Sequence, residues 1–156
     1  MFHRQIKERL SKIAPFLIYD DDPYLVVVDG RLFWVNDAFT ASSNYPYSER
    51  HDCGVNYIRN SVKAVVDAYT GDVTFYVFDE VDVLIKTWRK VFPDLFTPRT
   101  EMPKELLKHV RYPEDMLEIQ GEMYGTYHML DPEVFYNRED IWVRAVSYTH
   151  LRAHET

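Results

Sequence analysis

Three glutamates at helical spacing are the first side chains in this sequence that could carry chemistry. Glu114, Glu118 and Glu122 are four residues apart, so on a helix they would lie one above another and could ligate a metal. Carboxylate di-iron sites combine glutamates with Glu-x-x-His pairs on facing helices, and the sequence contains no Glu-x-x-His. Because glutamate is rarely buried, we interpret the row as a solvated helix face.

Other potential metal ligands or nucleophiles do not form a recognisable set. Asp20, Asp21 and Asp22 are consecutive, whereas an EF-hand needs alternating oxygen ligands around a central glycine. The lone Cys53 cannot form an internal disulfide and is interpreted as a small, partly buried thiol, although His51 lies close in sequence. The six histidines fall in no His-Glu-x-x-His or Cys-His arrangement: His3, His51, His109, His128, His150 and His154.

Nucleotide-binding and hydrolase signatures are also missing. The sequence contains no G-x-S-x-G, no phosphate-binding P-loop and no G-x-G-x-x-G. We therefore assign no catalytic, cofactor-binding or metal-binding residue, and we expect no cofactor and no stoichiometric zinc, iron or calcium. The enzyme question stays open at this point, leaning towards a protein without catalytic activity.

Charge and composition restrict the kinds of partner. The 156 residues carry a net charge of -7, which disfavours binding to a phosphate backbone and hence to nucleic acid. No apolar run approaches the roughly 18 residues of a membrane span, so we expect no direct membrane insertion by this segment. Aromatic residues make up 15% of the chain, enough for a dense core and a tyrosine-rich surface that could bind a protein or a glycan.

The sequence of the first half predicts one short helix followed by strands. Phe2, Ile6, Leu10 and Ile13 share a helical face that stops near Pro15. Asp29-Gly30 between the runs 24–28 and 31–35 predicts a type I′ hairpin, covered on both sides because both runs are apolar on both faces. Residues 37–52 lose this pattern and are interpreted as a loop. A second hairpin is predicted over 62–79, with Thr70-Gly71-Asp72 in its turn.

The second half of the chain predicts helices. Apolar residues from Val81 to Phe92 recur at helical spacing, with Asp79 able to cap the start and Pro93 ending the helix. Pro103 and Pro113 each open a further helix, and Asp131-Pro132 restarts a last turn or two that runs through Trp142. Gly121 and Gly125 in the Pro113 helix suggest close packing or a bend. Strands followed by helices predict an α+β fold with two antiparallel β-hairpins and several short amphipathic helices.

Several long strings in this chain resemble one known family. They are DPYLVVVDGRLFWVNDAFTASSNYPYSE (22–49), GVNYIRNSVKAVVDAYTGDVTFYVFDE (54–80), IKTWRKVFPDLFTPR (85–99), MPKELLKHVRYPEDM (102–116) and QGEMYGTYHMLDPEVFYNREDIW (120–142). Together they resemble uncharacterised protein family 0182, large bacterial multi-pass membrane proteins with a big extracytoplasmic region. The strand-turn-strand VDAYTGDV (66–73) also resembles, over a shorter stretch, that of PepSY-type extracytoplasmic domains.

The resemblance implies a location and a set of partners but no reaction. It implies that residues 1–142 are a fragment of an extracytoplasmic α+β domain whose parent protein resides in the cell membrane. The partner is then the remainder of that parent, with other envelope proteins or glycans as further candidates, and the role is structural or binding. The alternative is an envelope enzyme such as a hydrolase acting on a cell-wall polymer, which would show paired carboxylates in a groove, about 5 or about 6.5–9.5 Å apart for a glycosidase.

The last residues of the chain follow a different pattern. After Trp142, VRAVSYTHLRAHET shows no periodicity, and residues 146–156 resemble translated sequencing-adapter readthrough at the end of a truncated reading frame. We therefore expect 143–156 to be a non-native, unstructured tail that contributes nothing to folding. This interpretation removes His150 and His154 from any metal site.

Overall fold

The chain is divided into two compact units. The computed structural model describes residues 5–51 and 54–143. Contacts separate a first unit, Met1–Glu114, from a second, Asp115–Thr156. The fragment expected over 1–142 thus contains the whole first unit and much of the second, while Cys53 and most of the expected tail lie outside the described residues.

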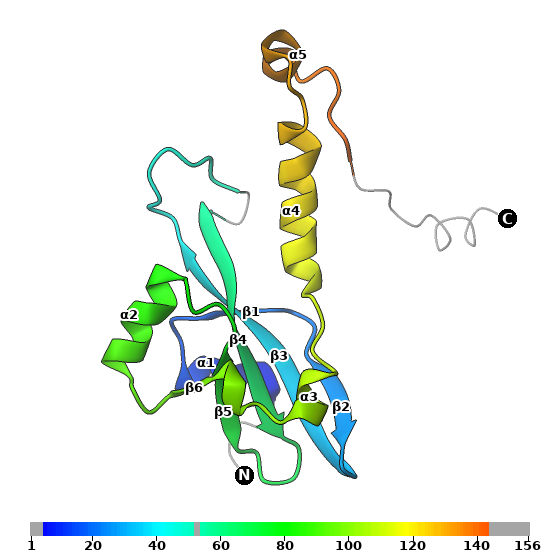
Figure 1. Ribbon diagram of the computed structural model, residues 1–156. Coiled ribbons are helices and arrows are strands. Elements are labelled where there is room, and N and C mark those ends of the chain that lie inside the picture. Colours follow the sequence, from blue (N-terminus) through cyan, green and yellow to red (C-terminus); the bar gives the residue numbers. More distant parts are fainter. Residues whose placement is uncertain (1–4, 52–53, 144–156) are drawn as a thin grey trace, which may run out of the picture. The chain divides into compact units, whose positions relative to one another are not determined.

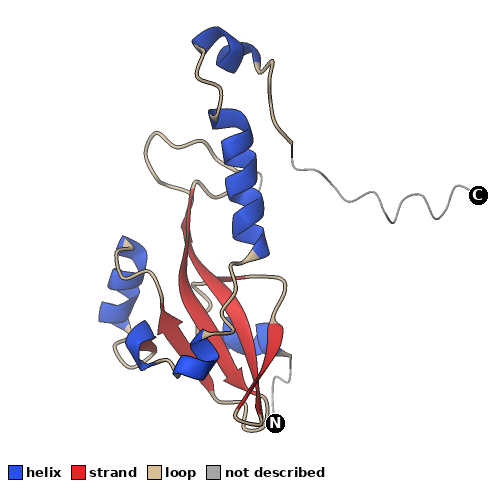
Figure 2. Ribbon diagram, turned by 45° about the vertical axis from the view of Figure 1, so that its right-hand side comes forward, coloured by secondary structure: helices blue, strands red, loops and turns tan. Residues whose placement is uncertain are grey.

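The first unit is built on a six-stranded mixed sheet (Figures 1 and 2). Its central strands are β3, Arg31–Ser42, and β4, Tyr57–Asp67, which pair antiparallel. β1, Ile18–Tyr19, and β2, Tyr24–Val28, both pair with the outer side of β3. β5, Val73–Val77, pairs antiparallel with β4, and β6, Phe96–Pro98, pairs parallel with β5. The predicted α+β class and both predicted hairpins are confirmed.

The two hairpin turns follow the chemistry of their residues. Asp29 and Gly30 both have positive φ, 48° and 75°, as a type I′ turn requires. At the second turn, the Asp67 carboxylate accepts the backbone N–H groups of Tyr69 at 2.8 Å and Thr70 at 3.1 Å. These bonds, with the Arg31 guanidinium 2.7 Å from Asp67, hold the pKa of Asp67 below its ordinary value.

The prediction of a loop over residues 37–52 is wrong for its first residues. β3 continues through Ser42, and only residues 43–56 connect it to β4. The polar residues that broke the apparent pattern are buried because they face partners on β4: Asp37 stands opposite Lys63 and Thr40 opposite Arg59. The register shifts between Ala38 and Thr40, which marks a β-bulge at the centre of the sheet.

Each face of the sheet carries its own apolar cluster. One cluster packs α1, Ile6–Ile13, and α2, Val83–Val91, on the sheet through Leu10 and Ile85. The other packs the short helix α3, Lys104–Leu107, on the opposite face through Leu106 together with Met102. The predicted helix before Pro15 and the predicted helix after Pro103 are therefore confirmed, although Ile13 is exposed.

The first hairpin is not covered on both sides as expected. Val26 and Val28 are buried in the second cluster, but Leu25 and Val27 on the other face are 43% and 60% exposed. These two side chains belong to neither apolar cluster of the first unit.

The helical half differs from the expectation in three ways. α2 begins at Val83 rather than Asp79, and its N-cap is Asp82. The parallel strand β6, followed by a 3-10 turn over Arg99–Glu101, lies between α2 and α3 and was not predicted. In the second unit, α4 spans Glu114–Tyr127, and α5, Pro132–Asn137, is capped by Asp131 but ends before Trp142. Among the described residues, no helix combines the length and apolar character needed to cross a membrane.

Asp82 ties α2 to the two central strands. It is 1% exposed, and its carboxylate accepts hydrogen bonds from the Leu84 and Ile85 backbone N–H groups at 3.1 and 3.2 Å. Three hydroxyl groups also donate to it: Thr40 at 2.5 Å, Tyr57 at 2.6 Å and Ser61 at 2.7 Å.

The ionisation of Asp82 and Tyr57 is set by this contact. Burial raises the pKa of the Asp82 carboxyl, but the hydrogen bonds from Thr40, Tyr57, Ser61 and Leu84 outweigh it, so the pKa lies below its ordinary value. Burial, and then the bond to Asp82, raise the pKa of Tyr57 to about 12, so Tyr57 remains a donor. The ionised Asp82 is thus the stabilising form.

We predict that Asp82→Ala lowers the free energy of unfolding by about 2–4 kcal/mol. Loss of a helix cap accounts for about 1–2 kcal/mol, and the hydroxyl groups left without an acceptor account for the rest. Urea unfolding at pH 7 measures the effect. Asp79→Ala is the control, because Asp79 makes a partly exposed ion pair with Arg59 and its loss should cost under about 1 kcal/mol. Equal losses in the two variants would refute the role of Asp82.

The same contact predicts a pH dependence. A carboxyl group whose folded pKa is depressed binds more protons in the unfolded chain, so its stabilisation is present above the unfolded pKa, about 3.9, and is lost as pH falls through the folded value. We expect Asp82→Asn to unfold with a shallower loss of stability below about pH 4 than the parent chain. Parallel slopes for the two proteins in acid titrations of the unfolding midpoint would contradict this.

Candidate functional site

The residues singled out from the sequence do not converge on a site. Glu114, Glu118 and Glu122 lie on exposed positions of α4. Asp21 is ion-paired with Lys7, while Asp20 is buried and its carboxylate accepts the Asp22 backbone N–H at 2.9 Å. Within residues 5–51 and 54–143, no group of three or more His, Cys, Asp or Glu side chains could hold a metal ion.

The histidines and the cysteine are equally scattered. His51 lies in the loop before β4, His109 follows α3, and His128 follows α4. Cys53, His3, His150 and His154 fall outside the described residues. A His51–Cys53 pair therefore stays without a structural description.

The first unit contains a buried ion pair with further polar side chains around it, an arrangement also found in functional sites. Asp37 on β3 stands opposite Lys63 on β4, each is 3% exposed, and the Lys63 ammonium is ion-paired with the Asp37 carboxylate. The ammonium also donates to the Arg111 carbonyl at 3.1 Å, and the Asn60 side-chain amide donates to Asp37 at 2.8 Å. Each charge therefore has a partner of opposite charge and a second polar contact.

Tyr24 on β2 contacts Arg111, the residue whose carbonyl accepts from Lys63. Its hydroxyl oxygen accepts the Arg111 backbone N–H at 3.1 Å, and the Arg111 guanidinium lies 4.7 Å from the centre of its ring. Burial raises the pKa of Tyr24, and the negative charges of Asp37 and Asp20 raise it further. The hydroxyl therefore stays protonated, and the segment after α3 is held against β2.

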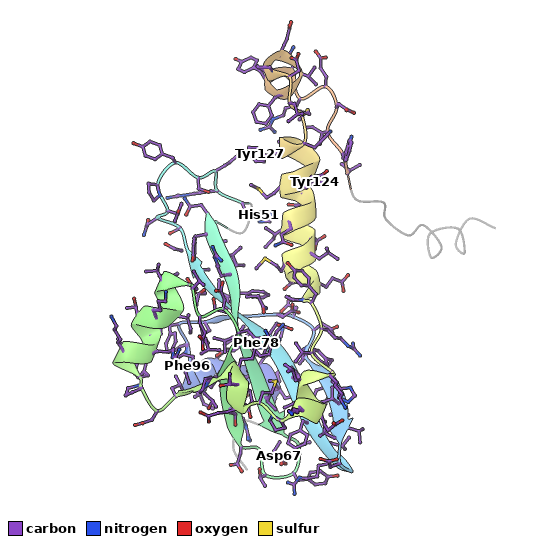
Figure 3. All side chains as sticks on the ribbon, viewed as in Figure 1. His51, Asp67, Phe78, Phe96, Tyr124 and Tyr127 are labelled. Atoms are coloured by element: carbon purple, nitrogen blue, oxygen red, sulfur yellow. The ribbon has the colours of Figure 1, made fainter. Side chains whose placement is uncertain are left out.

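The geometry of this polar cluster fits a structural role. Two hollows in the first unit, of ≈ 550 and ≈ 340 Å³, are lined by other residues, and neither lining includes Asp37 or Lys63. The Lys63 ammonium instead lies 5.7 Å from the centre of the Phe78 ring, which Arg99 approaches from 4.8 Å (Figure 3 labels Phe78). Sequence reasoning missed this pair, although a charge inside each apolar strand run, in FWVND and SVKAVV, was a usable signal.

The second unit offers a different kind of candidate, an apolar surface. None of the residues of the two apolar clusters belongs to this unit. Tyr124 and Tyr127 on α4, labelled in Figure 3, are both exposed. We use "the arm surface" for the exposed apolar residues of this unit: Leu117, Met123, Tyr124, Tyr127, Leu130, Phe135, Tyr136, Ile141, Trp142 and Val143.

Within the second unit, Trp142 packs closely on the end of α4. The Trp142 backbone N–H donates to the Gly125 carbonyl at 3.0 Å, and the Trp142 ring stacks on His128 with centroids 3.8 Å apart. A Cβ at Gly125 would lie 2.2 Å from the Trp142 carbonyl oxygen, so only glycine fits there, whereas a Cβ at Gly121 would meet nothing within 4 Å. Of the two glycines, Gly125 alone marks close packing.

Comparisons with known proteins all point to one family. A family model described as "Uncharacterised protein family (UPF0182)" matches residues 1–153. A UPF0182 protein from Desulforamulus reducens is 58% identical over 144 residues, which cover 91% of this chain and 16% of the relative. A UPF0182 protein from Methanospirillum hungatei JF-1 is 55% identical over 147 residues, covering 90% and 16%.

The extent of these matches bears on the size of the protein. A further UPF0182 protein, from Synechococcus sp. (strain JA-3-3Ab), is 54% identical and is covered over 17% of its length. The chain therefore spans about 16% of the length of the curated relatives it matches. The family model reaches past Trp142, into the segment expected to be non-native. No solved structure matches the chain.

We predict that Lys63→Met lowers the free energy of unfolding by about 3–5 kcal/mol, because it leaves the Asp37 charge buried without its counter-charge. Asp37→Leu/Lys63→Met should recover a large part of this loss, since it removes both charges together. Urea unfolding of the three proteins measures both effects. Lys86→Met on the exposed side of α2 is the matched control, expected within about 0.5 kcal/mol of the parent. If the double variant were no more stable than Lys63→Met, the proposed charge pairing would be wrong.

Proposed function

The chain belongs to the uncharacterised protein family UPF0182, and from this membership we propose that it is one part of the extracytoplasmic region of a cell-membrane protein, with a structural or binding role. The first unit supplies a rigid α+β body, and the arm surface supplies the contact. The proposed partner is the remainder of the same parent protein, because the chain spans only about 16% of its relatives.

The arm surface is the observation that carries this proposal. Leu130 is 94% exposed and Tyr136 is 86% exposed, and several further apolar side chains of the same short unit face solvent. Single exposed apolar residues are ordinary, but a gathering of them in one short segment is typical of an interaction surface. Aromatic side chains are enriched at such contacts, and half of the arm surface residues are aromatic.

Two carboxylates of the first unit, Asp67 and Asp82, have the surroundings of structural caps rather than of a catalytic acid. A hydrolase acting on a glycan needs an acid whose pKa is raised so that it can give a proton near neutral pH. Asp67 and Asp82 have the opposite character, because the pKa of each carboxyl group lies below its ordinary value. Both carboxylates are held by hydrogen bonds from the backbone and from side chains, which is the arrangement of structural caps.

We expect the 156-residue chain to bind a hydrophobic dye or to self-associate, and Leu130→Lys/Tyr136→Lys to reduce either signal several-fold. The exposed apolar side chains are accessible, and a charge at each position makes the surface unfavourable for apolar ligands. Dye fluorescence and light scattering after gel filtration are the measurements. Val81→Lys/Val91→Lys, at exposed positions of the first unit, should leave both signals unchanged. A monomeric chain that binds no dye would contradict the binding role.

The extracytoplasmic location has its own test in the full-length membrane protein that carries this segment. In a cysteine-free background, Tyr47→Cys places a thiol at a fully exposed loop position. We expect a membrane-impermeant maleimide to label it in intact cells, because the segment faces away from the cytoplasm. Labelling that appears only after permeabilisation would place the segment on the cytoplasmic side and overturn the proposed location.

A further inference from the structure

β2 lies at an open edge of the sheet (Figures 1 and 2). It pairs with β3 along one side over five residues, Tyr24–Val28, and no described strand pairs with its other side. An edge strand presents unpaired N–H and C=O groups, so it can accept another strand.

The turn geometry shows which backbone groups are available. The type I′ turn at Asp29-Gly30 is closed by Val28 and Arg31. The closing pair of a two-residue hairpin is hydrogen-bonded, and bonded and non-bonded pairs alternate along an antiparallel ladder. Leu25 and Val27 therefore occupy non-bonded positions, where their backbone N–H and C=O groups point away from β3. These two residues also have the exposed side chains of the strand.

β2 lacks the features by which sheets usually protect their edges. Proteins blunt edge strands with charges, proline, bulges or short length. The other edge follows this rule, because β6 has three residues and ends in Pro98. β1, on the same side as β2, has only two residues and is followed by three aspartates. β2 reads YLVVV, with no charge, no proline and no register shift.

The exposed face of β2 lies beside a hollow whose lining combines apolar side chains with charged ones, among them Arg9 and Asp67. Leu25 pairs with Trp34 and Val27 with Leu32, so these side chains share one face of the sheet. Trp34 also lines the hollow of ≈ 550 Å³, together with Ile6, Pro23 and Val66. A strand added beside Leu25 and Val27 would place every second side chain on this face, above the hollow.

We propose that β2 is a docking edge for an extended, apolar segment of the parent protein that lies outside this chain, added as a further strand of the sheet. This chain spans about 16% of its relatives, so the parent protein contains other segments from which the added strand can come. Backbone hydrogen bonds to Leu25 and Val27 give the pairing, and alternate side chains over Trp34 give the specificity. The proposal rests on the same partner as the proposed function, the remainder of the parent protein, but it uses a surface in the other unit and does not depend on the arm surface.

The first test compares hydrogen exchange in the 156-residue chain and in the full-length protein that contains it. We expect the amides of Leu25 and Val27 to exchange about tenfold more slowly, or slower still, in the full-length protein, because a strand partner protects them. Peptides from the loop over residues 43–51 serve as the internal control and should exchange equally in both. Equal exchange of residues 24–28 in the two proteins would overturn the proposal.

A matched pair of substitutions separates docking from stability. Val27→Lys and Val91→Lys both change a valine that is more than half exposed, so neither should alter the melting temperature of the 156-residue chain. In the full-length protein, Val27→Lys should abolish the added protection of residues 24–28, and Val91→Lys should preserve it. Amide protection of residues 24–28 could instead rise with the concentration of the 156-residue chain and be no greater in the full-length protein. That result would assign the edge to a second copy of the chain and overturn the proposal. Neither outcome depends on which side of the membrane the segment occupies.

Discussion

The buried carboxylate of Asp82 is the interaction on which the arrangement of the first unit depends. It accepts hydrogen bonds from β3, β4 and the first turn of α2, so one side chain fixes a helix onto two strands. The β-bulge near Thr40 is part of this contact, because it brings the Thr40 and Ser61 hydroxyls to 3.0 Å from each other at the carboxylate. A buried charge is tolerable there only because each of its oxygen atoms is hydrogen-bonded.

The sequence predicted those elements whose signals are local. Asp29-Gly30, Pro103 and Asp131-Pro132 each fix a turn or a helix start through the backbone conformation of one or two residues, and all three are found where expected. The strand over Asp37–Ser42 was missed because its polar residues are buried by partners more than twenty positions away, and Asp79 was preferred to Asp82 because the deciding hydroxyls lie on β3 and β4. The buried ion pair, the parallel strand β6 and the arm surface likewise depend on pairings or exposure that a local pattern does not contain.

The buried polar side chains and the exposed apolar side chains of this chain differ in how well their surroundings satisfy them. Asp37, Lys63 and Asp82 are buried with their charges matched or hydrogen-bonded, so each of them stabilises the packed interior. The apolar residues at the β2 edge and in the second unit have the opposite character, since they are exposed where burial would stabilise them. For a member of UPF0182 that spans about 16% of its relatives, such surfaces are expected where the rest of the protein makes contact.

The order of elements along the chain also governs how this fold is made during translation. β2, β3, β4 and β5 follow one another and can pair as they leave the ribosome. Met102 and Leu106, which cover Val26, Val35 and Val65, are synthesised only after α2 and β6. At ordinary elongation rates, the roughly 26 residues between β5 and α3 take about 1–5 seconds, and during that time Met102 and Leu106 do not yet cover their face of the nascent sheet. A chaperone that holds apolar strands would find its binding window there, between the appearance of β5 and that of α3.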